Sequence, residues 1–325
     1  MKVVRFSAEH KATWDGFVAT SKNGSFLFYR DYISYHQDRF HDHSLLFYDD
    51  KEGLIALFPA NQRGQNLYSH GGLTYGGFVS DERMKLSKML TCFLALFEYA
   101  KNAGLKEIYY KCIPYIYHAI PSQEDLYVLH LSRATCTSRS VITAIDTNRI
   151  LKFQTRRVRQ IKTAQKNQIF VQQSADLATY WEILTGLLKS VHNTKPVHSL
   201  AEIQHLQALF PDNIKLFASY HESEMIAGVL IYETSQVART QYIAASPKGR
   251  DSGALDVIFD ELIHNYYQHK AYIEFGTSER ANTRNYVNAG LIDQKEGFGA
   301  RAIIQDQYLI QLDNVSIEVL VEAYS

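Results

Sequence analysis

The order of elements that decides the fold is contained in residues 214–275, IKLFASYHESEMIAGVLIYETSQVARTQYIAASPKGRDSGALDVIFDELIHNYYQHKAYIEF. Two β-rich runs flank the turn residues HESE, which predicts a hairpin. A third strand, a glycine-containing loop, a helix with an apolar stripe and a final strand should follow. These elements are expected at residues 214–220 and 225–232, 237–244, 246–253, 254–268 and 271–275.

The same order occurs about 170 residues earlier in the chain. A hairpin is again followed by a glycine-rich segment, YSHGGLTYGGF, then a long helix and a strand. The long helix should be capped by Ser80 or Asp81 and should stop at Gly104. Helices are also expected at residues 14–21 and 203–210. The earlier elements are expected at residues 44–48 and 54–59, 68–78, 82–102 and 107–113. Similarity at this spacing predicts a duplicated domain rather than a solenoid.

Composition bounds the class of protein. The chain has 325 residues, 46% of them apolar, with 34 basic and 34 acidic side chains. This mixture excludes a disordered chain, and zero net charge excludes a global basic field for DNA. We expect two domains, residues 1–147 and 148–325. The N-terminus lacks an apolar run and no stretch is long enough to span a bilayer, which predicts a cytoplasmic protein. The three cysteines, Cys92, Cys112 and Cys136, are expected to be buried free thiols.

A basic segment, residues 149–169, lies between the two copies. Val158, Ile161 and Ala164 recur at helical spacing, and no acidic residue lies between Arg149 and Lys166. One interpretation is a solvated surface helix. The other is a clamp for phosphate, diphosphate or an RNA backbone.

Several chemistries are excluded by missing motifs. The chain has no G-x-S-x-G elbow and no G-x-x-x-x-G-K-[ST] loop. The run Gly297 to Ala302 matches G-x-G-x-x-A but lacks a strand before it and a helix after it, so we reject a dinucleotide loop. His36, His41 and His43 fit no zinc spacing, and we expect no metal.

Two segments carry candidate chemistry. Residues 246–253, SPKGRDSG, join a strand to a helix, and a helix N-terminus with glycines and basic side chains can bind a diphosphate. The other interpretation is an ordinary turn. Further on, Lys295 stands beside Gly297 and Gly299, after a polar segment that contains Ser278 and Glu279. Loops at strand ends often carry function.

With these residues in place, the chain resembles a known family. The segments SFLFYRDYISYHQDRF, GGLTYGGF, RRVRQIKTAQKN, PVHSLAEI, EFGTSE and QKEGFGA resemble GNAT-superfamily proteins of the FemAB-like branch, especially those of bacterial surface-polysaccharide gene clusters. The resemblance covers residues 14–310. It implies an α+β fold of two tandem GNAT-like domains, each a mixed, mostly antiparallel sheet flanked by helices. The first domain would serve the acceptor and the second the acyl donor.

The resemblance also implies N-acyl transfer to the amine of an amino sugar or of a nucleotide- or lipid-linked sugar. Acyl-CoA, above all acetyl-CoA, would be the donor. Residues 250–255 match the [QR]-x-x-G-x-[GA] pattern except at Leu255. Donor-binding candidates are Ser246, Lys248, Gly249, Arg250, Gly253 and Ala254.

Lys295 of the K-x-x-F-G segment would lie near the reacting carbonyl and stabilise its negative charge. Glu279, His198 and Glu202 are candidates for the base that takes the proton of the amine. We expect the acceptor to contact Arg156, Arg159, Tyr75, Tyr242 and Phe298, at the junction of the two copies.

Two alternatives stay open at this point. In the first alternative the donor is an aminoacyl-tRNA, although the chain lacks the helical hairpin that some relatives use to contact tRNA. In the second the protein is a non-catalytic GNAT-like binding module. Peripheral contact of the basic helix with an anionic membrane also stays open. The sequence determines neither the acceptor sugar nor the oligomeric state.

Overall fold

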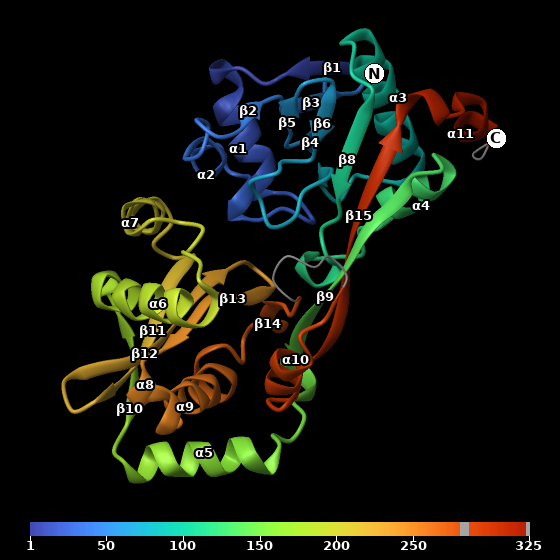
Figure 1. Cartoon of the computed structure of the whole chain (residues 1–325). Helices are drawn as coiled ribbons and strands as arrows, with labels where there is room; N and C mark the ends of the chain where they lie inside the picture. Colours follow the sequence, from blue (N-terminus) through green and yellow to red (C-terminus); the bar gives the residue numbers. More distant parts are fainter. Residues whose placement is uncertain (280–285, 323–325) are drawn as a thin grey trace. The chain divides into compact units, whose positions relative to one another are not determined.

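The computed structural model describes residues 1–279 and 286–322, which form two compact units (Figure 1). Unit 1 comprises Met1–Ser140 and Ile304–Ser325, and unit 2 comprises Val141–Ile303. The sequence placed the C-terminal segment in the second domain, whereas the structure groups it with unit 1. The reason is strand pairing, because β15 (Arg301–Gln311) pairs antiparallel with β8 (Glu107–Lys111).

Unit 1 contains two sheets, with strand orders β1-β3-β4-β7 and β15-β8-β6-β5-β2. Its elements are β1 (Lys2–Arg5), α1 (Lys11–Ala19), α2 (Arg30–Ser34), β2 (His41–Asp42), β3 (Leu45–Tyr48), β4 (Leu54–Phe58), β5 (Asn61–Arg63), β6 (Asn66–Tyr68), β7 (Val79–Ser80), α3 (Leu86–Asn102), β8, α4 (Glu124–Leu131) and α11 (Ile317–Glu322). The hairpin predicted from residues 44–59 is confirmed as β3 and β4, which pair antiparallel.

The core of unit 1 forms around α3. Its apolar side chains recur at helical spacing and pack with those of β3, β4 and β8. The helix begins at Leu86, after Lys85, so the predicted cap at Ser80 or Asp81 is wrong. Ser80 belongs to β7, and the carboxylate of Asp81 accepts a hydrogen bond from the side chain of Arg83 instead. The predicted stop is confirmed, since Gly104 has a φ of 71° just beyond the helix.

Unit 2 is built on strands in the order β10-β11-β12-β13-β14-β9. Its elements are α5 (Thr155–Lys166), β10 (Phe170–Ser174), α6 (Leu177–His192), α7 (Leu200–Leu209), β11 (Ile214–His221), β12 (Glu224–Glu233), β13 (Val237–Ala245), α8 (Pro247–Asp251), α9 (Ala254–Glu261), β14 (Tyr272–Thr277) and α10 (Ala289–Glu296), together with β9 (Thr135–Asp146), whose first residues belong to unit 1. The predicted second hairpin and its third strand are confirmed as β11, β12 and β13.

Helices cover both faces of β12. Val229 and Ile231 share a core cluster with Ile258 of α9, whereas Gly228 faces Tyr180 of α6. Because successive side chains of a strand point to opposite faces, α6 and α9 lie on opposite sides of the sheet. This explains why β12 is apolar almost throughout.

Three features differ from the sequence prediction. Residues 247–251 form the short helix α8 rather than a loop. The α-helix that follows ends at Glu261 and continues as one π-helical turn, Leu262–Tyr266. Cys136 is exposed, so the expectation of three buried thiols holds only for Cys92 and Cys112.

Candidate active site at the end of β14

Strands β13 and β14 pair only at their N-terminal ends, and their C-terminal residues do not pair with each other. Residues 237–239 pair in parallel with residues 272–274, although β13 continues to Ala245 and β14 to Thr277. Just beyond the last pair, β13 carries an extra residue, Gln241, relative to β12. Such a bulge bends its strand and increases its twist. The bulge therefore explains why the two strands stop pairing at this point.

Lys295 lies at the end of β14. It belongs to the last turn of α10, and its side chain is only 4% exposed. Its Nζ donates to the carbonyl oxygens of Gly276 and Thr277 at 3.0 and 2.8 Å and to Oγ of Ser278 at 2.8 Å. Burial lowers the pKa of Lys295 to about 8, although nearby Glu274 acts in the opposite direction. An ammonium group has three N–H donors, and all three are used here.

A buried ion pair supports the same turn. Glu274 is fully buried on β14, and its Oε2 accepts a hydrogen bond from Nη1 of Arg239 on β13 at 2.9 Å. Its Oε1 accepts from the backbone N–H of Gly276 at 2.5 Å. Gly276 has a φ of 71°, a left-handed conformation that favours glycine. Glu274 therefore fixes the turn that presents two carbonyl groups to Lys295.

Glu279 follows directly after this turn. The residue forms an isolated antiparallel bridge with Val287 and is half-buried. Its Oε1 is shielded from solvent and has no hydrogen-bond partner among the residues that the structure describes. Buried carboxylate oxygens in proteins normally accept a hydrogen bond.

The structure brings His198 and Tyr242 together. Nδ1 of His198 lies 2.7 Å from Oη of Tyr242, and Trp181 packs edge-on against the same tyrosine ring. Burial raises the pKa of Tyr242. Ser199 caps α7 and Glu202 completes a capping box with it, so the carboxylate of Glu202 is already used.

The glycines expected to approach a diphosphate are explained by packing within unit 2. A Cβ atom on Gly249 would lie 2.2 Å from the carbonyl oxygen of Ile226 on β12. A Cβ atom on Gly253 would lie 2.4 Å from the carbonyl oxygen of Gln160 on α5, and its φ of 76° also favours glycine. Ser246 caps α8 by accepting from the N–H of Gly249.

The remaining donor-binding candidates have varied surroundings. Lys248 forms an exposed ion pair with Glu224 at 2.6 Å. The side chain of Ala254 is fully buried. Arg250 is exposed, so among these candidates it presents a cation to solvent at this end of the sheet.

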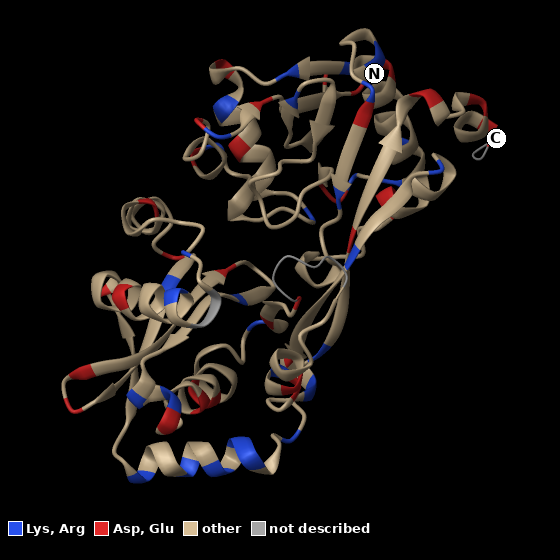
Figure 2. Cartoon of the chain, in the orientation of Figure 1, with Lys and Arg blue, Asp and Glu red and all other residues tan. Residues whose placement is uncertain are grey.

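The basic helix is confirmed as α5, whose ribbon is coloured largely by Lys and Arg residues in Figure 2. Arg156 bonds to the backbone oxygen of Asp293 at 2.8 Å and pairs with its carboxylate, whereas Arg159 is exposed. Arg157 turns inward, where it pairs with Asp256 at 2.9 Å and lies over the ring of Phe298. One part of the basic set therefore holds α5 in place, and another part faces solvent.

Two predicted contact residues lie in hydrophobic cores. Phe298 is 1% exposed and packs with Phe259 and Phe275 in unit 2. Tyr75 is 1% exposed in unit 1, where its hydroxyl donates to Oγ of Ser25 at 3.0 Å. Packing accounts for both residues without a ligand.

The part of the chain that the structure describes contains neither a group of metal-binding side chains nor a membrane-spanning helix. In residues 1–279 and 286–322, no group of three or more His, Cys, Asp or Glu side chains is arranged to hold a metal ion. No helix within the same ranges has both the length and the apolar character required to cross a bilayer.

The structure thus brings Lys295 and Ser278 together, places Glu279 next along the chain, and joins His198 to Tyr242. Sequence reasoning missed Arg239 and Glu274. The signal for Glu274 was present, because it is the one acidic residue within the strand sequence YIEFG. Its partner could not be identified without knowing which strands pair.

Comparison with known proteins supports the fold. No family model matches the chain, and no match was found among curated proteins. Among solved structures, FemX matches with a TM-score of 0.68 and 12% identity over 99% of both chains. A Bacteroides thetaiotaomicron protein of unknown function matches with a TM-score of 0.62 and 11% identity over 95% of this chain and 98% of the other. A tandem GNAT protein from the clavulanic acid biosynthesis pathway matches with a TM-score of 0.51 and 8% identity over 96% and 98%. The predicted α+β, tandem GNAT-like fold of the FemAB type is therefore confirmed.

Proposed function

We propose that the protein is an N-acyltransferase that moves an acyl group from acyl-CoA to the amine of an amino sugar or of a nucleotide- or lipid-linked sugar. One observation carries the proposal. The buried ammonium group of Lys295 lies where β14 ends, beside strands that no longer pair with each other. A preorganised positive charge at a strand end is what a reaction that develops negative charge on an oxygen atom requires.

The acyl group passes from the sulfur atom of CoA to the nitrogen atom of the amine. The lone pair of the amine forms the new C–N bond, charge develops on the carbonyl oxygen, and the C–S bond then breaks to release the thiolate. Since Lys295 uses its three N–H groups on Gly276, Thr277 and Ser278, we propose that it acts through Ser278. The Oγ atom of Ser278 accepts from the ammonium, and we propose that its own O–H donates to the charged oxygen. A contact of this kind typically contributes a few kcal/mol.

The proton of the attacking amine needs an acceptor, and Glu279 is the better supported candidate. Its Oε1 has no partner among the described residues, and Glu279 is adjacent in sequence to Ser278. His198 stays a candidate, with Tyr242 holding its Nδ1. Glu202 is disfavoured because its carboxylate belongs to the cap of α7.

The donor fits the open side of β13. Backbone groups of residues 240–245 are not paired with β14, and an extended chain that carries amides can bond to such an edge as an added strand would. The pantetheine arm of CoA is a chain of this type. Arg250 is exposed shortly after the end of β13, where Lys248 is already paired with Glu224, and we propose that Arg250 contacts the diphosphate.

Aminoacyl transfer from tRNA is the second candidate function. The observation that favours it is the exposed part of the α5 basic set, which includes Arg159 and lies in a segment without acidic residues. A polyanionic backbone would bind such a surface in a strongly salt-dependent way. The high coverage of FemX in the structural comparison is compatible with either donor.

The first experiment separates these donors. Acetyl-CoA at 100 times its Kd should stabilise the protein by about 3 kcal/mol, seen as a higher Tm, whereas charged tRNA should not. An Arg250→Ala variant should lose most of the stabilisation, and a Lys195→Ala variant, altered at an exposed residue outside the site, should keep it. Stabilisation by charged tRNA alone would select the second candidate. Binding of neither donor would leave a non-catalytic binding protein.

A further inference from the structure

Unit 1 contains a pocket that the proposed chemistry does not use. Its volume is about 390 Å³, near the lower end of the range for small-molecule sites. This volume accommodates one small ring-shaped ligand rather than an extended chain. Its lining includes Lys11, Arg30, Gln37, Phe40, Asp42 and His70.

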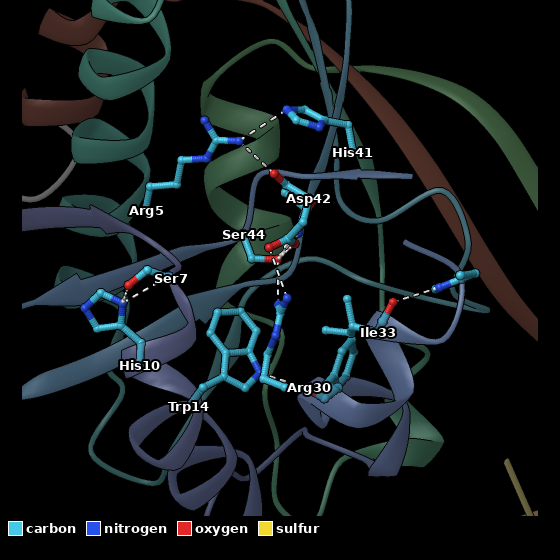
Figure 3. A network of polar contacts seen from close by, with 12 residues as sticks. Arg5, Ser7, His10, Trp14, Arg30, Ile33, His41, Asp42 and Ser44 are labelled. Carbon is cyan, nitrogen blue, oxygen red and sulfur yellow. Dashed lines mark hydrogen bonds and ion pairs between the residues drawn. The ribbon is translucent and has the colours of Figure 1, made fainter. Parts of the chain in front are cut away.

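Arg30 is the buried cation of this pocket. It is 4% exposed, and its guanidinium group lies 3.6 Å from the ring centroid of Phe6 (Figure 3 shows its polar contacts). Nη2 donates to Asp42 at 3.0 Å and Nη1 to Ser44 at 3.2 Å, while Nε is buried and has no hydrogen-bond partner among the residues that the structure describes. A guanidinium group has five N–H donors, so these contacts leave donors unused in a nine-tenths buried side chain.

His70 is a second buried polar group that lines the pocket. It is 1% exposed and packs against the rings of His36 and Phe40. Its Nδ1 is buried and has no hydrogen-bond partner among the described residues. Burial, with Arg30 and His36 nearby, lowers the pKa of His70 well below its ordinary value. The ring is therefore neutral at pH 7 and carries one donor and one acceptor.

The lining fits a polyhydroxylated ring better than an anion or a hydrocarbon. Arg30 and Gln37 supply donors, Asp42 supplies a carboxylate acceptor, and neutral His70 supplies one of each. Each hydroxyl group of a sugar both donates and accepts, and the C–H face of the sugar can pack on the partly exposed ring of Phe40. The carboxylate of Asp42 would repel an anion, and the other lining cation, Lys11, is already paired with Asp15 and Asp31. A hydrocarbon would leave Arg30 and His70 unpaired, which is costly.

We propose that this pocket binds a single saccharide residue. The proposal deepens the proposed function, on which it rests for the role of the sugar as acceptor. Binding itself needs no acyl donor, so it can be measured separately. Arg30 and Asp42 would bond to neighbouring hydroxyl groups of the sugar, and His70 would bond to another.

The experiment is saturation-transfer NMR of N-acetylglucosamine with the full-length protein, followed by titration. The wild type should transfer saturation to the ring protons of the sugar. Gln37→Ala should weaken binding two- to tenfold, the effect of one lost hydrogen bond. Asp42→Asn should weaken it further. Gln65→Ala, a matched change at an exposed residue outside the pocket lining, should bind as the wild type does.

Binding of the sugar by the two pocket variants tests the proposal. If Asp42→Asn fails to fold because Arg30 loses its partner, Gln37→Ala still gives the answer, since its side chain is exposed. The proposal is overturned if the sugar gives no signal at tens of millimolar, if inorganic phosphate binds instead, or if Gln37→Ala binds like the wild type. Sugar binding without acyl transfer would refute the proposed function and leave the pocket standing. Transfer to an amino sugar with an unchanged KM in both pocket variants would refute the pocket alone.

Discussion

Replacing Lys295 with Met should remove a pH dependence of stability that arises in unit 2. Lys295→Met keeps most of the side-chain volume but deletes the ammonium group. In the unfolded chain the lysine titrates with its ordinary pKa of 10.5, whereas burial lowers the pKa of the folded state to about 8. Between these values the unfolded chain binds more protons, so the free energy of unfolding rises with pH.

The magnitude follows from the same shift. A difference of about 2.5 pKa units at 1.4 kcal/mol each corresponds to about 3.5 kcal/mol. Most of this is regained between pH 7 and pH 10, so the wild type should gain about 2.5 kcal/mol relative to Lys295→Met over that interval. The three acceptors left without a donor add a constant offset, which does not change the pH dependence.

The assay is urea unfolding at several pH values, followed by tryptophan fluorescence. The chain has two tryptophans, Trp14 in unit 1 and buried Trp181 in unit 2. A Trp14→Phe background makes the signal specific for unit 2, and subtracting the variant from the wild type cancels the other titrating groups. A difference that stays flat from pH 7 to pH 10 would show that Lys295 is not buried as described, and the reasoning would fail.

Two further predictions concern the support of the site. Arg239→Met should destabilise unit 2 by about 3–5 kcal/mol in urea unfolding, because it leaves the buried carboxylate of Glu274 without its cation. Adding Glu274→Leu should restore much of the lost stability. An Arg239→Met protein as stable as the wild type would contradict the ion pair. Gly249→Ala should destabilise the protein by about 1–3 kcal/mol in the absence of any ligand, since the new Cβ atom would meet the carbonyl of Ile226. In the control Gly186→Ala, within α6, the new Cβ atom meets no other atom, and the protein should be stabilised by about 0.5–1 kcal/mol. Differential scanning calorimetry measures both effects. Equal effects of the two alanines would show that Gly249 is not confined by β12.

The sequence predicted those parts of the fold that depend on local pattern. Alternating apolar residues and turn residues identified both hairpins, and a glycine after α3 marked its end. Long-range pairing could not be predicted. The association of β15 with β8 joins Gln307 to Lys111, and no local signal specifies that pairing.

The candidate site divides in the same way. Lys295 was identified because a lysine between apolar elements and glycines is unusual for a solvated surface. Arg239 and Glu274 were missed because they meet across two strands that are separated in sequence by α8 and α9. Gly249 and Gly253 show a different limit. A glycine required by a neighbouring backbone looks the same in sequence as one required by a ligand.

The central claim is that Lys295, through Ser278, stabilises the charge that develops during acyl transfer. The direct measurement is single-turnover acyl transfer from acetyl-CoA to glucosamine, followed by thiol release, with the wild type, Ser278→Ala and Lys295→Met. The account predicts a rate at least about 100-fold lower in both variants, with acetyl-CoA binding retained. Full single-turnover transfer by a folded Lys295→Met protein would contradict it.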